Sequence, residues 1–194
     1  MQADSEAAIA CLTDFTSLSS PLLSGPDGCT IVYNGYIEEK PQIDHMRLRP
    51  YQTKDWPRLC AIHDSARMDE LRASGLTEAF LTLEQAAENE GLFECSVTVA
   101  EDGERVLGFV AIKDDELTWL YVDPAAYRRG VGRALVRHAI GSCKGTISVE
   151  VLVGNEPALR LYLAEGFKIL KRVDGRMTGN EAFAASGYVL ELCR

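Results

Sequence analysis

The sequence has no long hydrophobic run, because nowhere in its 194 residues do 18 apolar residues follow one another. A membrane-spanning helix needs about 20 such residues, so we expect no membrane partner. The first residues are acidic and lack the basic start of a signal peptide. Both absences favour a cytoplasmic protein.

The sequence also has few basic residues, with 20 Lys and Arg against 29 Asp and Glu and a formal net charge of −9. General nucleic-acid binding uses a basic face, so we expect no nucleic-acid partner. The acidity either favours a cationic substrate such as an amine or simply keeps the protein soluble. The six cysteines form no C-x-x-C pair and have no His cluster beside them, which predicts reduced thiols and no metal site.

Residues 1–45 differ from the rest of the chain. The stretch 12–29 is rich in Ser, Pro and Gly and has no sustained period. Asn34-Gly35 between two β-rich runs indicates a hairpin over about 29–40. We therefore expect an N-terminal extension over 1–45 and one domain over 46–194. Alternative interpretations make the extension a partner-docking arm, a hairpin of a homodimer, or a leader before an original start at Met46.

From Met46 onward the hydrophobic pattern is regular. It predicts strands at 46–52, 95–101, 105–113, 116–123, 146–153, 167–173 and 187–193. Helices are expected over 55–74, 82–91, from the glycine-rich turn to about 141, and 155–166. Asp55 is the expected N-cap of the first helix, and Gly75 its end. The order β-α-α-β-β-β-α-β-α-β-β predicts a mixed α/β domain with hairpins at its centre.

Residues 127–132 read YRRGVG and lie between a predicted strand and a predicted helix. The start of a helix carries free N–H groups and partial positive charge. Gly130 and Gly132 would let a ligand approach that backbone closely. Three cations lie beside them: Arg128, Arg129 and Arg133. The turn therefore predicts a site for a phosphate or pyrophosphate, although Leu135 replaces the third glycine of a dinucleotide fingerprint.

This turn resembles the acetyl-CoA signature Q/R-x-x-G-x-G/A of the GCN5-related N-acetyltransferase (GNAT) superfamily. A second segment resembles the family pattern Asn-x-x-Ala-x-x-x-Tyr-x-x-x-Gly-Phe, with Asn155, Ala158, Tyr162, Gly166 and Phe167. The predicted element order from Met46 also agrees with the family fold, a mostly antiparallel mixed sheet flanked by helices. Tyr127 stands where the signature usually has Gln or Arg, and Arg128 would supply the missing charge.

The resemblance implies an N-acetyltransferase in which an amine directly attacks acetyl-CoA in a ternary complex, with no metal. The pantetheine arm of the cofactor would lie against the backbone of Leu120, Tyr121 and Val122, as an added strand would. Asn155 would also bind this arm, although its position equally predicts a helix cap. The pyrophosphate would contact Arg128, Arg129, Gly130, Val131, Gly132 and Arg133.

The resemblance also implies catalytic roles. Tyr162 would act as the general acid that protonates the thiolate of coenzyme A, and its alternative role is an aromatic in the core. A free alkyl amine has a pKa near 10, so a base or a water chain leading to one is needed. Glu116, at the start of the strand before the turn, is the predicted base, and its alternative is a solvated strand end. His63 is another candidate base.

The segment 64–91 would shape the acceptor pocket. It carries Asp64, Asp69, Glu70, Glu78, Glu84, Glu88 and Glu90 against Arg67 and Arg72. These acids form either a rim that selects a cationic amine or the solvated faces of two helices. The acceptor would be a small molecule or a protein amine. The rival interpretation is a non-catalytic acyl-CoA-binding or regulatory domain on the same fold.

Overall fold

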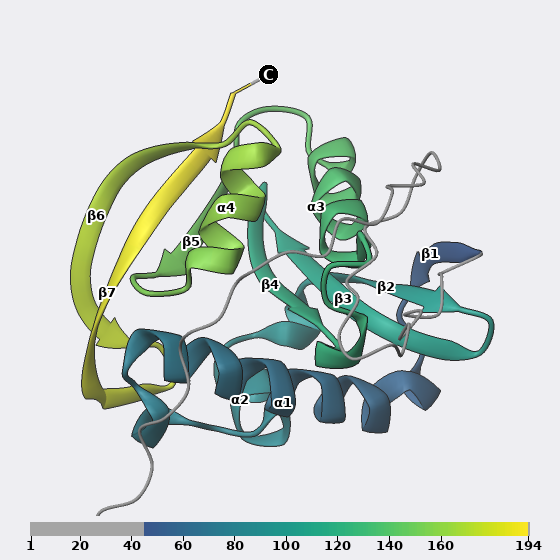
Figure 1. The fold of residues 1–194 in the computed structure, drawn as a ribbon, viewed down its shortest axis with the longest axis horizontal. Coiled ribbons are helices and arrows are strands. Elements are labelled where there is room, and N and C mark those ends of the chain that lie inside the picture. The colour runs from purple at the N-terminus through teal and green to yellow at the C-terminus, as the bar shows by residue number, and fades with distance from the viewer. Residues whose placement is uncertain (1–44, 194) are drawn as a thin grey trace, which may run out of the picture. The chain divides into compact units, whose positions relative to one another are not determined.

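The structure is a computed structural model, and it describes residues 45–193. The predicted hairpin over 29–40 lies outside these residues. The elements follow the predicted order (Figure 1). The strands are β1 (Met46–Pro50), β2 (Ser96–Asp102), β3 (Arg105–Lys113), β4 (Glu116–Val122), β5 (Ile147–Leu152), β6 (Lys168–Met177) and β7 (Asn180–Leu192). The helices are α1 (Trp56–Ser74), α2 (Leu83–Asn89), α3 (Val131–Ser142) and α4 (Glu156–Ala164).

The strands form one seven-stranded sheet in the order β1-β2-β3-β4-β5-β7-β6. Every neighbouring pair is antiparallel except β4 and β5, which are parallel. The prediction of a mostly antiparallel mixed sheet is therefore confirmed. Helices α1 and α2 cover one face of the sheet, and α3 and α4 cover the other (Figure 1).

Strands β4 and β5 pair over a very short distance. Their register holds only two residue pairs, Glu116 with Ser148 and Leu117 with Val149. Beside this point, the β3–β4 register shifts so that Thr118 is an extra residue on β4, a bulge that bends the strand. Beyond Leu117 the two strands separate. We call the resulting space the β4–β5 opening, with its apex at Leu117.

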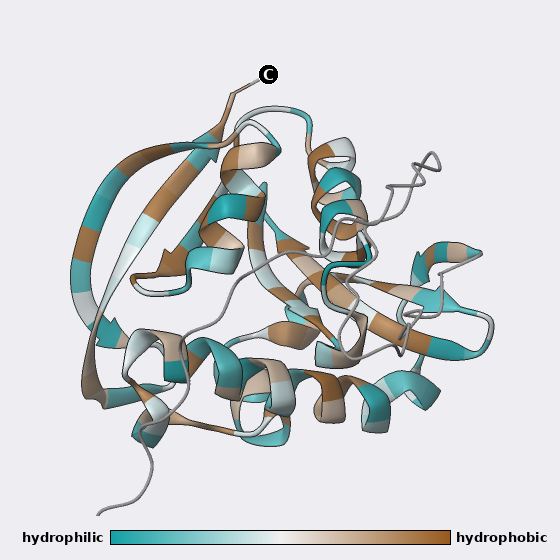
Figure 2. Cartoon of the chain, in the orientation of Figure 1, coloured by the Kyte–Doolittle hydropathy of each residue, from teal (hydrophilic) through white to brown (hydrophobic). Residues whose placement is uncertain are grey.

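Two hydrophobic clusters hold the helices to the sheet. On the α3 and α4 side, Leu135, Tyr162 and Leu190 belong to one buried cluster. On the α1 and α2 side, Leu59 and Phe109 belong to the second. Apolar residues recur along the strands between the two helix layers (Figure 2). This burial supplies most of the driving force that fixes the helices on the sheet.

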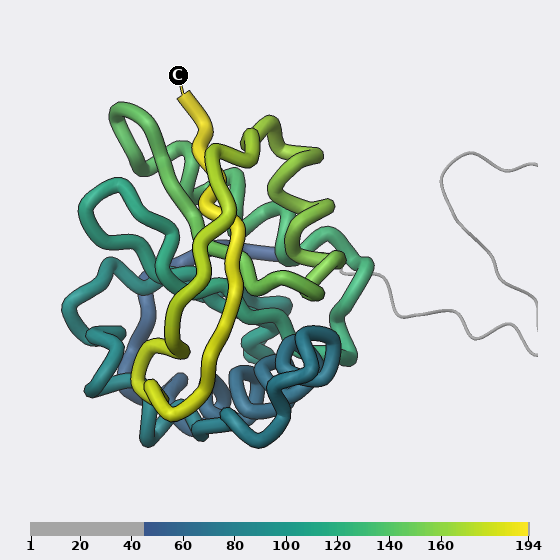
Figure 3. Tube along the Cα trace, turned by 90° about the vertical axis from the view of Figure 1, so that its left-hand side faces the viewer, coloured from purple at the N-terminus to yellow at the C-terminus, as the bar shows by residue number. Residues whose placement is uncertain are grey.

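Strands β6 and β7 form a long hairpin that runs along the molecule to the region of α1 and α2 (Figure 3). Met177 at its tip belongs to a third buried cluster with Leu71 and Ala79. The predicted strands 167–173 and 187–193 are therefore only the base of a longer hairpin. Its distal part has the mixed sequence DGRMTGNEAF, which lacks the apolar alternation that marks a strand.

Helix α1 begins and ends where the sequence predicted, but its start is built differently. Gly75 ends it in the left-handed region, at φ 71°, which glycine adopts without strain. Asp55 occupies the N-cap position, yet its side chain makes no capping bond to the helix. Its carboxylate instead accepts hydrogen bonds from Arg49 Nη1 at 2.7 Å and from the Gln52 backbone N–H at 2.8 Å. The ion pair with β1 replaces the predicted cap.

Candidate active site

The glycine turn opens α3 with its backbone donors unused by any cap. Gly130 is the N-cap at φ 85°, and no side chain caps the helix, so the N–H groups of its first turn remain available to an anion. Only glycine adopts this φ easily. A Cβ added to Gly132 would lie 3.2 Å from Leu161 Cδ2, so the second glycine allows α3 to pack closely on α4.

The arginines of the turn have unequal surroundings. Among residues 45–193, Arg128 and Arg129 form no ion pair, and the buried Nε of Arg129 has no hydrogen-bond partner. A buried guanidinium nitrogen without an acceptor is costly, so this atom is suited to receive an anionic group. Arg133 differs, because its Nε pairs with Glu165 Oε1 at 2.9 Å. The turn thus fits a pyrophosphate, with Arg133 also tied to the end of α4.

The β4–β5 opening has β4 as one wall, and β5 with the start of α4 as the other. Leu120, Tyr121 and Val122 of β4 pair with β3 on one edge but not with β5 on the other. That free edge can receive an extended ligand as an added strand would. On the far wall, Asn155 Oδ1 accepts from the Ala158 N–H at 3.3 Å. The predicted helix cap is therefore confirmed, and the pantetheine role of Asn155 stays a prediction.

Tyr162 lies on α4 and is only 4% exposed. Its ring meets the Phe167 ring edge to face, with centroids 5.5 Å apart, as a core aromatic would. Burial, followed by the negative charge of Glu70, raises the pKa of the Tyr162 hydroxyl well above its usual value. The phenol therefore keeps its proton at neutral pH, as a proton donor must.

Glu70 of α1 joins the two walls of the opening. Its Oε1 accepts a hydrogen bond from Asn155 Nδ2 at 3.2 Å. Its Oε2 accepts from Arg67 Nη1 at 2.7 Å and from the Tyr121 hydroxyl at 3.4 Å. The sequence alone does not distinguish Glu70 from the six other acids of segment 64–91. Its partners, Tyr121 on β4 and Asn155 at the N-cap of α4, lie 51 and 85 residues away along the chain.

Glu116 lies next to the apex, on the paired part of β4, and away from this cluster. It pairs with Lys113 across the β3–β4 hairpin and with Ser148 of β5. Its side chain is exposed, as the alternative of a solvated strand end predicts. Partial desolvation, and then the charge of Glu150, raises the pKa of its carboxyl. Glu116 thus has the raised basicity of a candidate base, but it lies on a different part of β4 from Tyr121.

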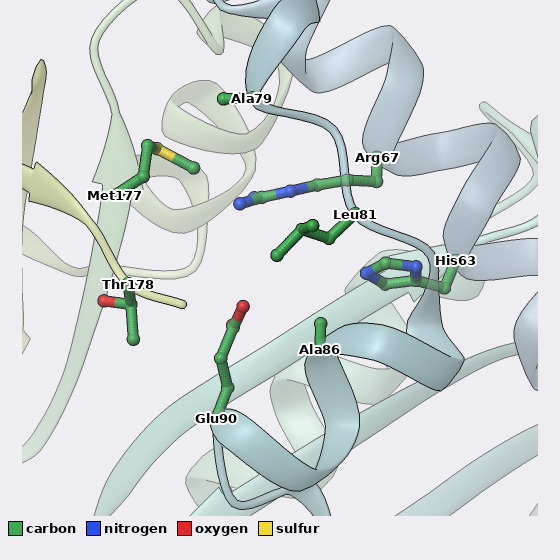
Figure 4. Close-up of a pocket in the computed structure, with 8 residues that line it drawn as sticks. All are labelled: His63, Arg67, Ala79, Leu81, Ala86, Glu90, Met177 and Thr178. Carbon is green, nitrogen blue, oxygen red and sulfur yellow. The ribbon is translucent and has the colours of Figure 1, made fainter. Parts of the chain in front are cut away.

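A pocket lies beside the cluster, between α1, α2 and the tip of the β6–β7 hairpin (Figure 4). It is lined by His63, Arg67, Ala79, Leu81, Ala86, Glu90, Met177 and Thr178. Arg67 and Glu90 both extend into it (Figure 4). Burial raises the pKa of Glu90, while Arg67 opposes that effect.

His63, the other candidate base, is nearly fully buried behind Tyr121. Its Nδ1 lies 2.9 Å from Asp64 Oδ1, and its ring centroid lies 4.6 Å from that of Tyr121. Burial lowers the pKa of the imidazole despite the neighbouring Asp64. His63 is therefore neutral at pH 7 and packs as part of the wall behind the opening.

Within residues 45–193, no group of three or more His, Cys, Asp or Glu side chains is arranged to hold a metal ion. None of the helices described here is long and apolar enough to cross a membrane.

Comparison with known proteins gives matches in sequence and in structure. A family model described as an acetyltransferase (GNAT) domain matches residues 93–169. The peptidyl-lysine N-acetyltransferase YjaB of Escherichia coli (strain K12) is 32% identical over 107 residues, which cover 52% of this chain and 72% of YjaB. The peptidyl-lysine N-acetyltransferase YiaC of the same organism is 39% identical over 71 residues, which cover 36% of this chain and 47% of YiaC. The chain therefore spans about half the length of YiaC.

The fold is also similar to that of a solved structure. The protein yncA of Salmonella typhimurium, described with its cofactor acetyl-CoA, matches with a TM-score of 0.54 and 19% identity, over 76% of this chain and 93% of yncA. At this identity the likeness concerns the fold. Together with the domain match and the identity to YjaB, it shows that the chain belongs to the GNAT family of N-acetyltransferases.

Proposed function

We propose that this protein transfers the acetyl group of acetyl-CoA to an amine of a protein, by direct attack in a ternary complex. The observation that carries the proposal is the β4–β5 opening. It has a free strand edge at Leu120–Val122 and an uncapped helix start at Gly130. A long ligand with an amide-rich arm and a pyrophosphate matches both features.

The residues that would hold acetyl-CoA follow from these features. Backbone groups of Leu120, Tyr121 and Val122 would bind its pantetheine arm, with Asn155 on the opposite wall. The pyrophosphate would be held by Arg128, Arg129, Gly130, Val131, Gly132 and Arg133. The bound co-substrate supplies an acetyl group on a thiol leaving group. The unpartnered Arg129 Nε supports this assignment, because a phosphate oxygen would satisfy it.

The chain's own residues would then move the protons. Tyr162, whose phenol stays protonated, would donate its proton to the departing thiolate of coenzyme A. Glu116, next to the apex, would accept the proton of the amine through water in the opening, and its raised pKa supports this assignment. Both assignments are predictions that the experiments below test.

We propose a lysine side chain as the acceptor amine. Two relatives, YjaB and YiaC, are named peptidyl-lysine N-acetyltransferases. The acidity of this chain, with a net charge of −9, would attract a cationic acceptor. The cytoplasmic location, the homodimer and the role of residues 1–45 stay predictions from the sequence.

The test is release of coenzyme A from acetyl-CoA by the full chain, with three acceptors. These are a lysine peptide blocked at its N-terminus, a peptide with a free N-terminal alanine and no lysine, and a polyamine. Faster release with the lysine peptide alone is expected. Release with another acceptor only would overturn the lysine assignment. Saturable acetyl-CoA binding without release on any acceptor would instead support the regulatory interpretation.

A further inference from the structure

The carboxylate of Glu70 has an unusual position among the acids of this chain. It hydrogen-bonds to Tyr121 on β4 and to Asn155 at the start of α4. These two residues belong to opposite walls of the opening, at which β4 and β5 no longer pair. Glu70 thus links the two sides of the opening through its side-chain hydrogen bonds.

The charge of Glu70 acts on the whole site. It is the second cause, after burial, of the raised pKa of Tyr162. The same charge also raises the pKa values of Tyr121, Tyr127 and Glu90. The side chain is 17% exposed. A carboxylate that is largely removed from water attracts a cation more strongly than one on the surface.

Glu70 still has room for another hydrogen-bond donor. An ionised carboxylate offers about four acceptor positions, and Glu70 uses one on Oε1 and two on Oε2. The Tyr121 contact is long, at 3.4 Å, so it is the contact that an ammonium group would most easily displace. Arg67 holds the carboxylate in place from the pocket side.

We propose that Glu70 is the acceptor-binding residue of this enzyme, and that its carboxylate receives a primary alkyl ammonium group in the β4–β5 opening. This inference rests on the proposed function and assigns the part of the site that selects the acceptor. An alkyl amine arrives as an ammonium ion at neutral pH, because its pKa is near 10. Glu70 would hold that ion beside Tyr162 until it loses its proton.

The neighbouring acids are less suited to this role. Asp69 turns toward the glycine turn, where it accepts from Tyr127, and it also pairs with Arg72. Glu90 extends into the pocket toward Arg67 (Figure 4). Among the residues described, only Glu70 has side-chain hydrogen bonds to both walls of the opening.

The first experiment is the isosteric variant E70Q, because an amide can still accept the hydrogen bond of Asn155 while losing the charge. Binding of a lysine peptide and of a matched norleucine peptide, in which a methyl replaces the ammonium, is measured on the complex with coenzyme A. The wild type should bind the lysine peptide more tightly. E70Q should weaken lysine binding by about 10- to 100-fold, as expected for a lost charged hydrogen bond, and leave norleucine binding unchanged.

Turnover gives a second readout. The KM for the lysine peptide should rise in E70Q by a similar factor, while the Kd for acetyl-CoA stays within about 3-fold of the wild type. E104Q is the matched control, because Glu104 is an exposed acid in the turn between β2 and β3. It should change none of these values. E70D keeps the charge, so it should retain part of the preference for lysine over norleucine if E70Q does not fold.

The outcomes separate this inference from the proposed function. Equal weakening of both peptides, or no change in either, would overturn the role of Glu70. So would a loss of acetyl-CoA affinity with unchanged peptide binding, since Glu70 would then only hold Asn155. Failure of the wild type to release coenzyme A would overturn the proposed function, and the two-peptide comparison would still report on Glu70.

Discussion

The hydroxyl of Tyr127 donates a hydrogen bond to Oδ2 of Asp69 at 3.4 Å. Tyr127 begins the YRRGVG turn, and Asp69 lies on α1 next to Glu70. Two consecutive residues of α1 therefore contact the turn that would hold the cofactor and the opening that would hold the acetyl group. Tyr127, at the position where the family signature usually has Gln or Arg, thus links the turn to α1.

Removing that hydroxyl should loosen the turn. In Y127F we expect the Kd for acetyl-CoA to rise about 2- to 10-fold, the effect of one ordinary hydrogen bond, with kcat at saturation retained. Isothermal titration calorimetry measures the Kd, and Y188F on β7 is the control for a lost phenol elsewhere. An unchanged Kd in Y127F would show that the contact does not hold the turn.

Replacing Gly130, whose backbone is in the left-handed region, by alanine should lower the stability, whereas the same change at a helical glycine should raise it. G130A introduces a Cβ at φ 85°, so we expect a loss of about 1 kcal/mol in the free energy of unfolding and weaker acetyl-CoA binding. Gly141 lies within α3, and its added Cβ would meet nothing within 4 Å. G141A should therefore stabilise by about 0.5 to 1 kcal/mol. Urea unfolding of both variants tests this pair, and equal effects would contradict it.

Loss of the Tyr162 hydroxyl should affect the chemistry and not the binding. We expect Y162F to lower kcat by about 100-fold or more, the usual contribution of a general acid, while the Kd for acetyl-CoA changes little. The buried ring stays in place beside Phe167, so its packing is kept. Coenzyme A release and calorimetry measure the two quantities. A Y162F variant with normal kcat would leave Tyr162 with its role in the core alone.

If Glu116 is the base, substitutions of Glu116 and of its neighbour Glu150 should have related effects on the rate. E116Q should lower kcat by about 100-fold if Glu116 takes the proton through water. Glu150 raises the pKa of Glu116, so E150Q should keep the activity and move the acidic limb of the kcat–pH profile to lower pH. Steady-state rates between pH 5 and 9 would show this. Full activity of E116Q would remove Glu116 from the mechanism.

Burial of His63 predicts a pH-dependent stability. Its pKa is lowered from 6.5 in the folded protein, so below pH 6.5 the unfolded chain binds a proton that the folded chain does not. Stability is therefore full above pH 6.5 and falls below it, by at most about 1.4 kcal/mol for each pH unit. Denaturant unfolding at pH 7.5 and 5.5 measures this fall. H63Q should reduce the difference between the two pH values, and an equal difference would assign it to other groups.

Much of the fold could be predicted because its signals are local. Gly75 ends α1, Asn155 caps α4, and the strands around β3 have clear apolar patterns. The distal part of the β6–β7 hairpin could not be predicted, since it is stabilised by cross-strand pairing and by contacts of Met177 with distant residues. The capping bond of Asp55 is another prediction that fails on a contact between elements. Its side chain pairs with Arg49 of β1, and the sequence around the helix start does not indicate that partner.

The sequence alone determined the glycine turn, the segment with Asn155 and Tyr162, and therefore the family resemblance, since these depend on short spacings along the chain. Only the tertiary structure decided which acid reaches the opening. Glu70 meets Tyr121 and Asn155 because α1 crosses the sheet where β4 and β5 separate. A contact between residues 85 positions apart depends on how helices pack on the sheet, and no local pattern records it.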